Sequence, residues 1–275
     1  MKKTFLAAVF AGLASTAAMA TPALYWTVDE LAVDTETGTS TVADLADLLN
    51  RPTTFSVNDM SLVYEALITQ GAFNQFGVAS FTETGRFQIS EYRTGYEPDG
   101  GSQGTVVGSA LNEAYSLWGE FTLFGTATIS GDQLIVSVTS GSMSAFADFS
   151  FVGETLSQLD PDAAVGGASA VQSGGATLTN IGNNNAGNGS FEVIWDDFAL
   201  SSFGELLWPS PSPFHMVIDV NSDVDGIQGA FNPAGTTATT GGQGNAYFAV
   251  PEPASVALLG LGLVGLGAIR RRKEI

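Results

Sequence analysis

One stretch of the chain restricts the fold more than any other: SLWGEFTLFGTATI at residues 116–129, followed directly by SGDQ. Its apolar and polar side chains alternate, with Leu117, Phe121, Leu123, Ala127 and Ile129 on one face and Glu120, Thr122, Thr126 and Thr128 on the other. A period of two is that of a β-strand with one buried face. Ser130–Gln133 has the composition of a turn, and the alternation then resumes at Leu134, Val136 and Val138. We therefore predict an antiparallel hairpin here.

Weaker alternation recurs along the rest of the chain, in segments separated by clusters of glycine, asparagine, aspartate and proline. The segments are MSLVYEALIT (60–69), GVASFTETG (77–85), RFQISEYR (86–93), SFEVIWDDFAL (190–200), PFHMVIDV (213–220) and NAYFAV (245–250). Only TVADLADLLN, residues 41–50, has the spacing of a short amphipathic helix. The pattern predicts a mainly β protein, an antiparallel β-sandwich or jelly-roll-like single domain flanked by an N-terminal signal helix and a C-terminal transmembrane helix.

Two glycine-rich segments interrupt this pattern. Residues 165–190 are dominated by Gly, Asn, Ser and Ala, and three structures suit them: a long surface loop, a flexible arm or weakly paired edge strands. Residues 233–249 are rich in Gly and Thr, which predicts a slack stalk. The predicted exported β domain therefore spans residues 21–232.

The N-terminus has the parts of a secretory signal peptide. Lys2 and Lys3 precede the apolar run Phe5–Leu13, and Ala18 and Ala20 occupy the two positions that signal peptidase reads. The run is far shorter than the roughly 20 apolar residues of a transmembrane helix. We predict that signal peptidase cleaves after Ala20 and removes residues 1–20.

The C-terminus combines an apolar run with a basic cluster. The sixteen residues 254–269 carry no charge. As a helix they would span roughly 24 Å, which is short for a bilayer. Arg270, Arg271, Arg272 and Lys273 follow, and such side chains reach the headgroups and hold the C-terminus on the cytoplasmic side. The tail is therefore either a permanent anchor or a label that is cut away.

The residues before this run favour the cleavable label. Val250, Pro251, Glu252 and Pro253 form a stiff, extended entry to the helix, which suits a processing enzyme. The order of this motif, the short helix and the arginine cluster in residues 250–275 resembles the PEP-CTERM sorting signal of exported proteins in Gram-negative bacteria. The resemblance implies export across the inner membrane, recognition by the membrane enzyme exosortase, cleavage near Pro-Glu-Pro, and delivery to the cell surface or extracellular matrix.

A second resemblance covers parts of the predicted β domain. The segments LVYEALIT, FGVASFTETGRFQISEY, TATISG and FHMVIDVNSD occur in this order. They are similar to the flocculation-associated PEP-CTERM proteins of sludge-forming bacteria. This similarity implies an extracellular protein that acts in flocs or biofilms.

The charge of the exported part restricts its partners. Residues 21–250 contain 26 carboxylates against only Arg51, Arg86 and Arg93, a formal charge of −23. Neutralising phosphates requires lysine and arginine, so nucleic acid is excluded as a partner. The chain has no cysteine, so no disulfide stabilises it. Such a surplus of carboxylates favours a response to divalent cations.

One acidic loop has part of a calcium-binding pattern. With Asn221 as position 1, Asp223 and Asp225 occupy positions 3 and 5, and Gly226 occupies position 6, where a sharp turn requires glycine. Position 12 is Asn232 instead of the usual bidentate glutamate. The loop is either a calcium site or an ordinary acidic turn after a strand.

The residues that catalysis needs are sparse. His215 is the single histidine, and no serine stands in a G-x-S-x-G setting. Carboxylate pairs occur at Asp160-Pro161-Asp162 and at Asp196-Asp197, but adjacent strand residues point to opposite faces. We therefore predict no catalytic residues and no enzyme.

Aromatic residues offer an alternative function. If several were exposed on one face, they would stack on sugar rings, whereas large aromatics of a β-sandwich usually lie in its core. The candidates are Trp26, Trp118, Trp195, Trp208, Tyr92, Tyr96 and Tyr115. Our first expectation is a structural or adhesive matrix protein. The alternatives are a carbohydrate-binding module that docks on secreted polysaccharide and an exported hydrolase.

Overall fold

The computed structural model describes residues 25–94, 104–106, 109–131, 133–151, 153–178, 189–209, 214–220 and 234–249. The chain divides into two compact units, and all described residues belong to the one that spans residues 23–251, here called the body. The predicted signal peptide, the tail from Val250 onward and the predicted calcium loop at residues 221–226 lie outside the described residues.

Most of the body is β-structure. The strands are β1 (Trp26–Asp29), β2 (Thr54–Val57), β3 (Asp59–Gln70), β4 (Val78–Thr94), β5 (Gly104–Thr105), β6 (Ser116–Ser130), β7 (Gln133–Asp148), β8 (Ala163–Ala168), β9 (Ala170–Leu178), β10 (Gly189–Leu200), β11 (Phe214–Val220) and β12 (Thr236–Ala249). The helices in the described part of the chain are α2 (Leu31–Thr37), α3 (Thr41–Leu49) and α4 (Ser202–Leu207).

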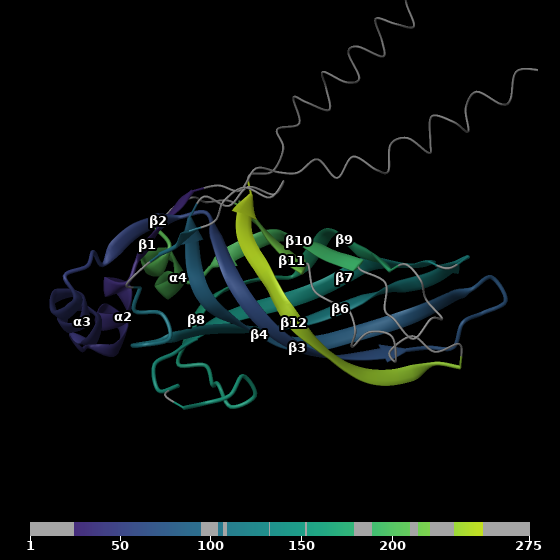
Figure 1. Ribbon diagram of the computed structural model, residues 1–275, viewed down its shortest axis with the longest axis horizontal. Coiled ribbons are helices and arrows are strands. Elements are labelled where there is room, and N and C mark those ends of the chain that lie inside the picture. Colours follow the sequence, from purple (N-terminus) through teal and green to yellow (C-terminus); the bar gives the residue numbers. More distant parts are fainter. Residues whose placement is uncertain are drawn as a thin grey trace, which may run out of the picture. The chain divides into compact units, whose positions relative to one another are not determined.

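The main sheet closes on itself (Figure 1). Its strands follow the order β11-β12-β3-β4-β6-β7-β8-β10-β9, with β5 attached to β4, and every pairing is antiparallel. A further pairing of β10 with β11, from Phe191 with Val220 to Phe198 with Phe214, closes the circuit. The predicted mainly β, antiparallel, single-domain fold is confirmed. A single barrel-like sheet has fewer free edges than the two stacked sheets of a sandwich.

The predicted hairpin is confirmed as β6 and β7. The two strands pair from Ser130 with Gln133 back to Ser116 with Asp148, with one register shift at Phe124 and Gly125. Gly131 in the turn has a φ of 66°, a left-handed conformation that glycine adopts without strain. The alternation at residues 116–139 therefore identified both the strands and their connection.

Two segments predicted as separate strands form one long strand, β4. The expected break at Gly85 is absent because this glycine is a packing position. A Cβ atom at Gly85 would lie 2.6 Å from the ring of Phe121 on β6 and 2.6 Å from the carbonyl oxygen of Glu65 on β3. Glycine thus lets an aromatic ring cross the neighbouring strand inside a narrow closed sheet.

The segment predicted as a loop, an arm or weakly paired edge strands is mostly strand. Residues 163–178 form β8 and β9, and each of these strands pairs with both β7 and β10. They are therefore inside the sheet and not at an edge, while residues 179–188 lie outside the described residues. Small side chains permit the close approach: a Cβ atom at Gly166 would lie 2.6 Å from the carbonyl oxygen of Ala199.

The predicted stalk at 233–249 is wrong. Residues 236–249 are strand β12, which pairs with β3 from Thr236 to Ala246 and with β11 from Asn245 to Ala249. Its Ala246 and Phe248 are fully buried in the main core. The Gly/Thr-rich composition predicted a slack chain. It could not show the neighbouring strands, against which this segment packs. The exported domain therefore extends beyond residue 232, to Ala249.

The helices and the β1–β2 pair cover one end of the sheet (Figure 1). The predicted helix at 41–50 is confirmed as α3, which ends at Asn50 in a left-handed conformation. The helices α2 and α4 were not predicted, since they have only seven and six residues, too few to display a clear apolar period. The α4 helix begins at Ser201, whose side chain accepts a hydrogen bond from the Gly204 amide at 3.0 Å.

Candidate functional site

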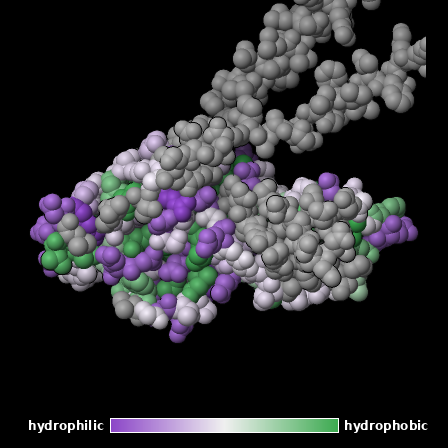
Figure 2. Space-filling view, viewed as in Figure 1, coloured by the Kyte–Doolittle hydropathy of each residue, from purple (hydrophilic) through white to green (hydrophobic). Residues whose placement is uncertain are grey.

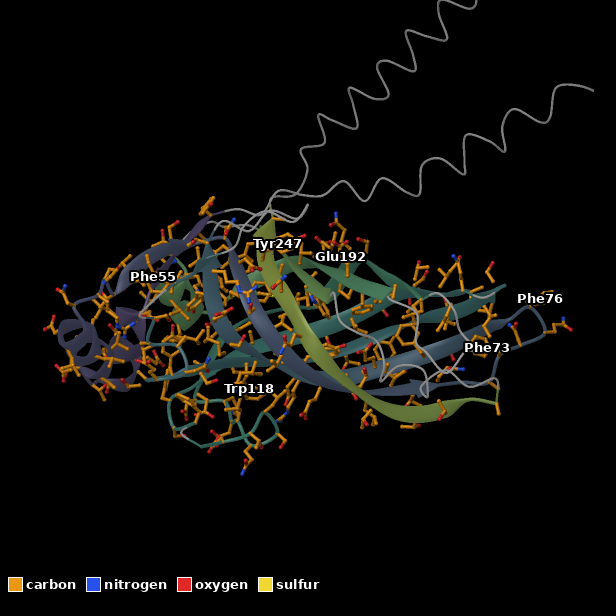
Figure 3. All side chains as sticks on the ribbon, in the orientation of Figure 1. Phe55, Phe73, Phe76, Trp118, Glu192 and Tyr247 are labelled. Carbon is orange, nitrogen blue, oxygen red and sulfur yellow. The ribbon has the colours of Figure 1, made fainter. Side chains whose placement is uncertain are left out.

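The connection between β7 and β8, residues 149–162, folds over the outer face of β4 and β6 (Figures 1 and 3). Arg86 of β4 holds it in place. The Arg86 guanidinium donates to the carbonyl oxygens of Ser157 at 3.2 Å and Leu159 at 3.4 Å, and it pairs with Glu120 at 2.6 Å. It also lies 4.9 Å from the ring centroid of Trp118, whose indole N–H donates to the Asp160 carbonyl at 3.3 Å. The loop therefore covers Trp118 and fixes Arg86.

Three carboxylates meet at the base of this loop. Asp148 at the end of β7, Asp160 and Asp162 each have an oxygen within 4.8 Å of the others, and Asp148 is buried whereas the other two are exposed. Asp148 accepts hydrogen bonds from the amides of Ser150 at 2.8 Å and Asp160 at 3.0 Å. Asp162 accepts one from the Phe149 amide at 2.7 Å. These bonds close the loop on itself.

The cluster concentrates negative charge. The pKa of Glu154 is raised, first by desolvation and then by the neighbouring charges of Asp148, Asp160 and Asp162. Carboxylate oxygens are the ligands that calcium prefers. Two of the three carboxylates are already engaged by loop amides, so the hydrogen bonds of the loop explain the cluster without an ion.

A groove runs along the outer face of the sheet next to this loop. It has a volume of about 650 Å³. Its walls come from β3, β4, β12 and the loop, and the lining residues are Glu65, Ala66, Leu67, Thr84, Gly85, Arg86, Ser157, Thr239, Thr240 and Gly241. Its size is in the range of small-molecule sites. Hydrophilic and hydrophobic residues are interspersed over the visible face of the body (Figure 2).

One acidic side chain lies inside the closed sheet. Glu83 points inward from β4, in register with Ile68 of β3 and Leu123 of β6. It is 7% exposed, and no described residue forms a hydrogen bond or ion pair with its carboxyl group. It borders a cavity of about 30 Å³ whose other lining residues are Leu62, Tyr64, Phe87, Phe121, Leu123, Phe191, Val193, Trp195 and Ile218. Burial raises the pKa of Glu83 to about 7.

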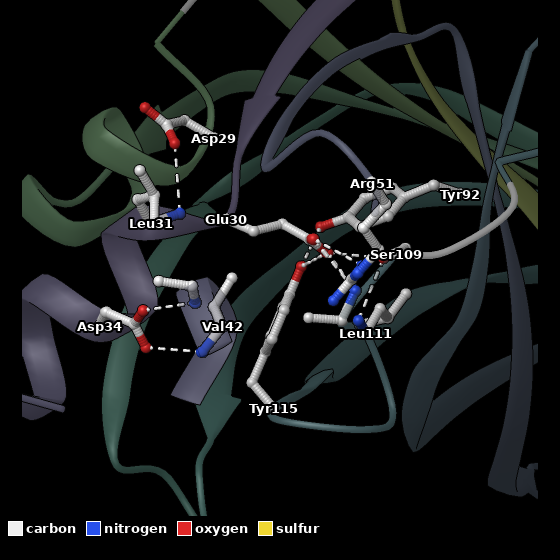
Figure 4. Close-up of polar contacts among 12 residues, drawn as sticks. Asp29, Glu30, Leu31, Asp34, Val42, Arg51, Tyr92, Ser109, Leu111 and Tyr115 are labelled. Carbon is white, nitrogen blue, oxygen red and sulfur yellow. Dashed lines mark hydrogen bonds and ion pairs between the residues drawn. The ribbon is translucent and has the colours of Figure 1, made fainter. Parts of the chain in front are cut away.

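A second buried carboxylate joins the helical end to the sheet (Figure 4). Glu30, fully buried, accepts hydrogen bonds from the Ser109 hydroxyl at 2.6 Å, the Ala110 amide at 2.8 Å and the Tyr115 hydroxyl at 3.0 Å. It also pairs with Arg51 at 3.3 Å. The pKa of the Tyr115 hydroxyl is raised, mainly because the group is buried. The group is enclosed on all sides, so it fastens β1 and α2 to the sheet.

Most aromatic residues proposed for sugar stacking are in the core. Trp26, Trp118, Trp195, Trp208, Tyr92 and Tyr115 are each at most 3% exposed, and Tyr96 lies outside the described residues. They therefore cannot stack on an external sugar. The large exposed aromatics among the described residues are Tyr25, Phe76 and Phe124.

The other predicted site residues do not come together. The backbone of His215 lies on β11 opposite Ala249, and its side chain is outside the described residues. Asp196 is half-buried on β10, and the side chain of Asp197 is likewise not described. Asp160 and Asp162 do lie together, but with Asp148, which the sequence analysis did not single out.

Sequence reasoning also missed Glu30 and Glu83. A signal for Glu83 was present, because Phe81, Glu83 and Phe87 share one face of an alternating segment. No comparable signal marked Glu30, which stands between a short strand and a short helix.

Comparisons with known proteins give a match for the tail and none for the body. The family model for the PEP-CTERM protein-sorting motif matches residues 249–273. No curated protein and no solved structure matches the chain. Among the described helices, none is long and apolar enough to cross a membrane.

Proposed function

We propose that this chain, an exported protein whose PEP-CTERM motif exosortase recognises, is a structural or adhesive component of the extracellular matrix in biofilms or flocs. The motif marks a protein for export, transient membrane anchoring and processing. The order of the segments LVYEALIT, FGVASFTETGRFQISEY, TATISG and FHMVIDVNSD, which is similar to that in flocculation-associated proteins, favours the same role. In this role the protein acts by binding and not by catalysis.

The observation that carries the proposal is the use of the basic residues. Residues 21–250 contain three arginines and no lysine, and each arginine forms an ion pair within the body. Arg51 pairs with Glu30, Arg86 with Glu120 and Arg93 with Glu91. The 26 carboxylates of residues 21–250 far outnumber these three arginines, and all three arginines are already engaged by carboxylates of the body, so its charge is strongly acidic.

This charge determines how the protein would bridge. Two acidic surfaces, or an acidic surface and an acidic polysaccharide, repel each other over about 8–10 Å at physiological salt. Calcium or magnesium removes the repulsion and links carboxylates on both sides. Bridging by this protein therefore requires divalent cations.

A deletion strain tests the proposal. Loss of the gene should weaken cell aggregation without abolishing polysaccharide synthesis, and chelation of calcium in the parent strain should reproduce part of the defect. Adding back purified residues 21–250 should restore aggregation. A matched variant with Glu36, Asp47, Glu113 and Glu205 changed to their amides, all exposed in the structure, should restore it with a weaker dependence on calcium. Normal aggregation in the deletion strain would refute the role.

The outer groove favours a second function, docking on a secreted polysaccharide. Its threonine and glutamate side chains offer hydrogen bonds to hydroxyl groups, in place of the aromatic stacking first considered. Thr84→Trp would fill the groove, and Thr128→Trp on the outer face of β6 is the control. Loss of polysaccharide retention in a pull-down with only the first variant supports this function, and equal retention contradicts it. Release of soluble sugar from the polymer by the purified body would indicate a hydrolase.

A further inference from the structure

The last described strand of the body ends where the sorting motif begins. Ala249 is the last residue of β12 and also the first residue matched by the family model. Only Val250 separates it from Pro251. The stalk expected at this position is therefore absent, and the cleavage signal follows directly on a strand of the closed sheet.

The end of β12 is buried on both faces. Ala246 and Phe248 face the main core, whereas Tyr247 and Ala249 form a second cluster with Val217 of β11. None of these four residues of β12 is more than 3% exposed. An enzyme that had to bind these residues as free, unpaired chain would have to break this packing.

The first residues of the mature chain close over the same place. Trp26 packs edge-on against Phe248, with ring centroids 4.7 Å apart, and Trp208 contacts Phe248 from another side at 5.4 Å. Trp26 is six residues after the predicted signal cleavage site at Ala20. The two chain exits of the body therefore lie at one corner, here called the exit corner and defined by Trp26, Trp208 and Phe248.

Chain length limits how far the exit corner can be from the membrane. Five residue steps separate Ala249 from Ala254, where the uncharged run starts. A fully extended chain covers at most about 3.6 Å per residue, so the limit is about 18 Å. While the uncharged run is in the bilayer, a folded body has to stay at the membrane surface.

We propose that exosortase cuts this chain with the body already folded, and that the surface around the exit corner docks on exosortase during the cut. The proposal rests on the sorting motif and is independent of the adhesive role. Two exposed apolar side chains are close in sequence to residues of the corner: Tyr25, 59% exposed, directly precedes Trp26, and Leu206, 50% exposed, is two residues before Trp208. Both suit an apolar contact at a membrane enzyme, where tyrosine is common at the interface.

The test measures processing of the full chain in cells that contain exosortase, by pulse-chase and intact mass. Leu206→Glu and Tyr25→Glu should each slow the appearance of the processed form about tenfold, because a charge replaces an apolar contact. Phe76→Glu, at a 75% exposed position at the opposite end of the sheet, is the matched control and should process at the normal rate (Figure 3). Melting temperatures of the purified variants check that all three remain folded.

A spacer separates docking from other causes. Twelve Gly/Ser residues inserted between Ala249 and Val250 free the motif from the body, so Leu206→Glu should no longer slow processing in that chain. Equal processing of Leu206→Glu, Tyr25→Glu and wild type at native spacing would overturn the proposal. It would also be overturned if the spacer chain kept the tenfold defect, or if the product ended before Ala249 and so lacked the end of β12. Binding of the purified body to protein-free phosphatidylcholine vesicles through Leu206 would assign the surface to lipid instead. The cell-aggregation phenotype plays no part in this test.

Discussion

Glu83 should make the stability of the body fall as the pH rises from about 4.5 to 7. Its carboxyl group is buried against Ile68 and Leu123 without a described partner, and its pKa is about 7 instead of the usual 4.5. Between these two values the folded state holds a proton that the unfolded state has lost. Stability therefore decreases by about 1.4 kcal/mol per pH unit in this window and levels off above it. The total effect is about 3 kcal/mol.

The variant Glu83→Gln isolates this effect. Glutamine is uncharged at every pH, so at pH 5 it should resemble the protonated wild type, with a difference below about 1 kcal/mol. At pH 8 the wild type must keep a charged group in an apolar interior, and the variant should be more stable by about 3 kcal/mol. For a domain of this size that corresponds to a rise in melting temperature of about 6–12 °C.

Urea unfolding of wild type and variant at pH 5, 6, 7 and 8 measures the difference directly, and other titrating groups cancel in the comparison. Glu36→Gln, the same change at an exposed position of α2, controls for the loss of one negative charge. A difference between Glu83→Gln and wild type that is the same at pH 5 and pH 8 would show that burial does not perturb this carboxyl group, and the reasoning would be wrong.

Three further predictions concern the loop, the last strand and the core. Asp148→Asn should lower the free energy of unfolding by about 2–4 kcal/mol in the same urea experiment, because the Asp148 carboxylate accepts hydrogen bonds from the amides of Ser150 and Asp160. Asp160→Asn, which changes an exposed side chain, should change the free energy of unfolding by less than about 1 kcal/mol. Equal effects of the two variants would refute the role of Asp148. Phe248→Ala should lower the free energy of unfolding by about 3–5 kcal/mol, because β12 is part of the core, whereas Gln243→Ala, at an exposed position, should hardly change it. A negligible loss for Phe248→Ala would show that residues 236–249 are a stalk after all. Because all four tryptophans are buried, fluorescence should show blue-shifted emission, weak quenching by acrylamide and no change on adding polysaccharide; strong quenching would contradict the described core.

The sequence by itself determined the class of fold and identified the sorting motif at residues 249–273. Alternation at residues 116–139 is a local property, because a strand with one buried face needs a period of two wherever its partners are, and this was enough to predict β6, β7 and their turn. The sorting motif is also local: its prolines, uncharged run and arginines are read along the chain. For this reason the family model finds it without the body.

Only the tertiary structure decided how glycine-rich segments are used. In β8, β9 and β12 the packing and the hydrogen bonds come from the neighbouring strands, which are β7 and β10 for β8 and β9, and β3 and β11 for β12, so composition could not distinguish these strands from loop or stalk. Closure of the sheet also depends on pairings that composition does not show, namely those of β10 with β11 and of β12 with β3.

The candidate sites follow the same rule. Asp148 meets Asp160 and Asp162 only because a loop folds back across β4 and β6, and Glu30 meets Arg51 and Tyr115 only because the helices cover the end of the sheet. Glu83 is an intermediate case. Alternation placed its side chain on the inner face, whereas the neighbouring strands determine that no described residue forms a hydrogen bond or ion pair with its carboxyl group. Local periodicity fixes which way a side chain points, but long-range pairing fixes what it meets.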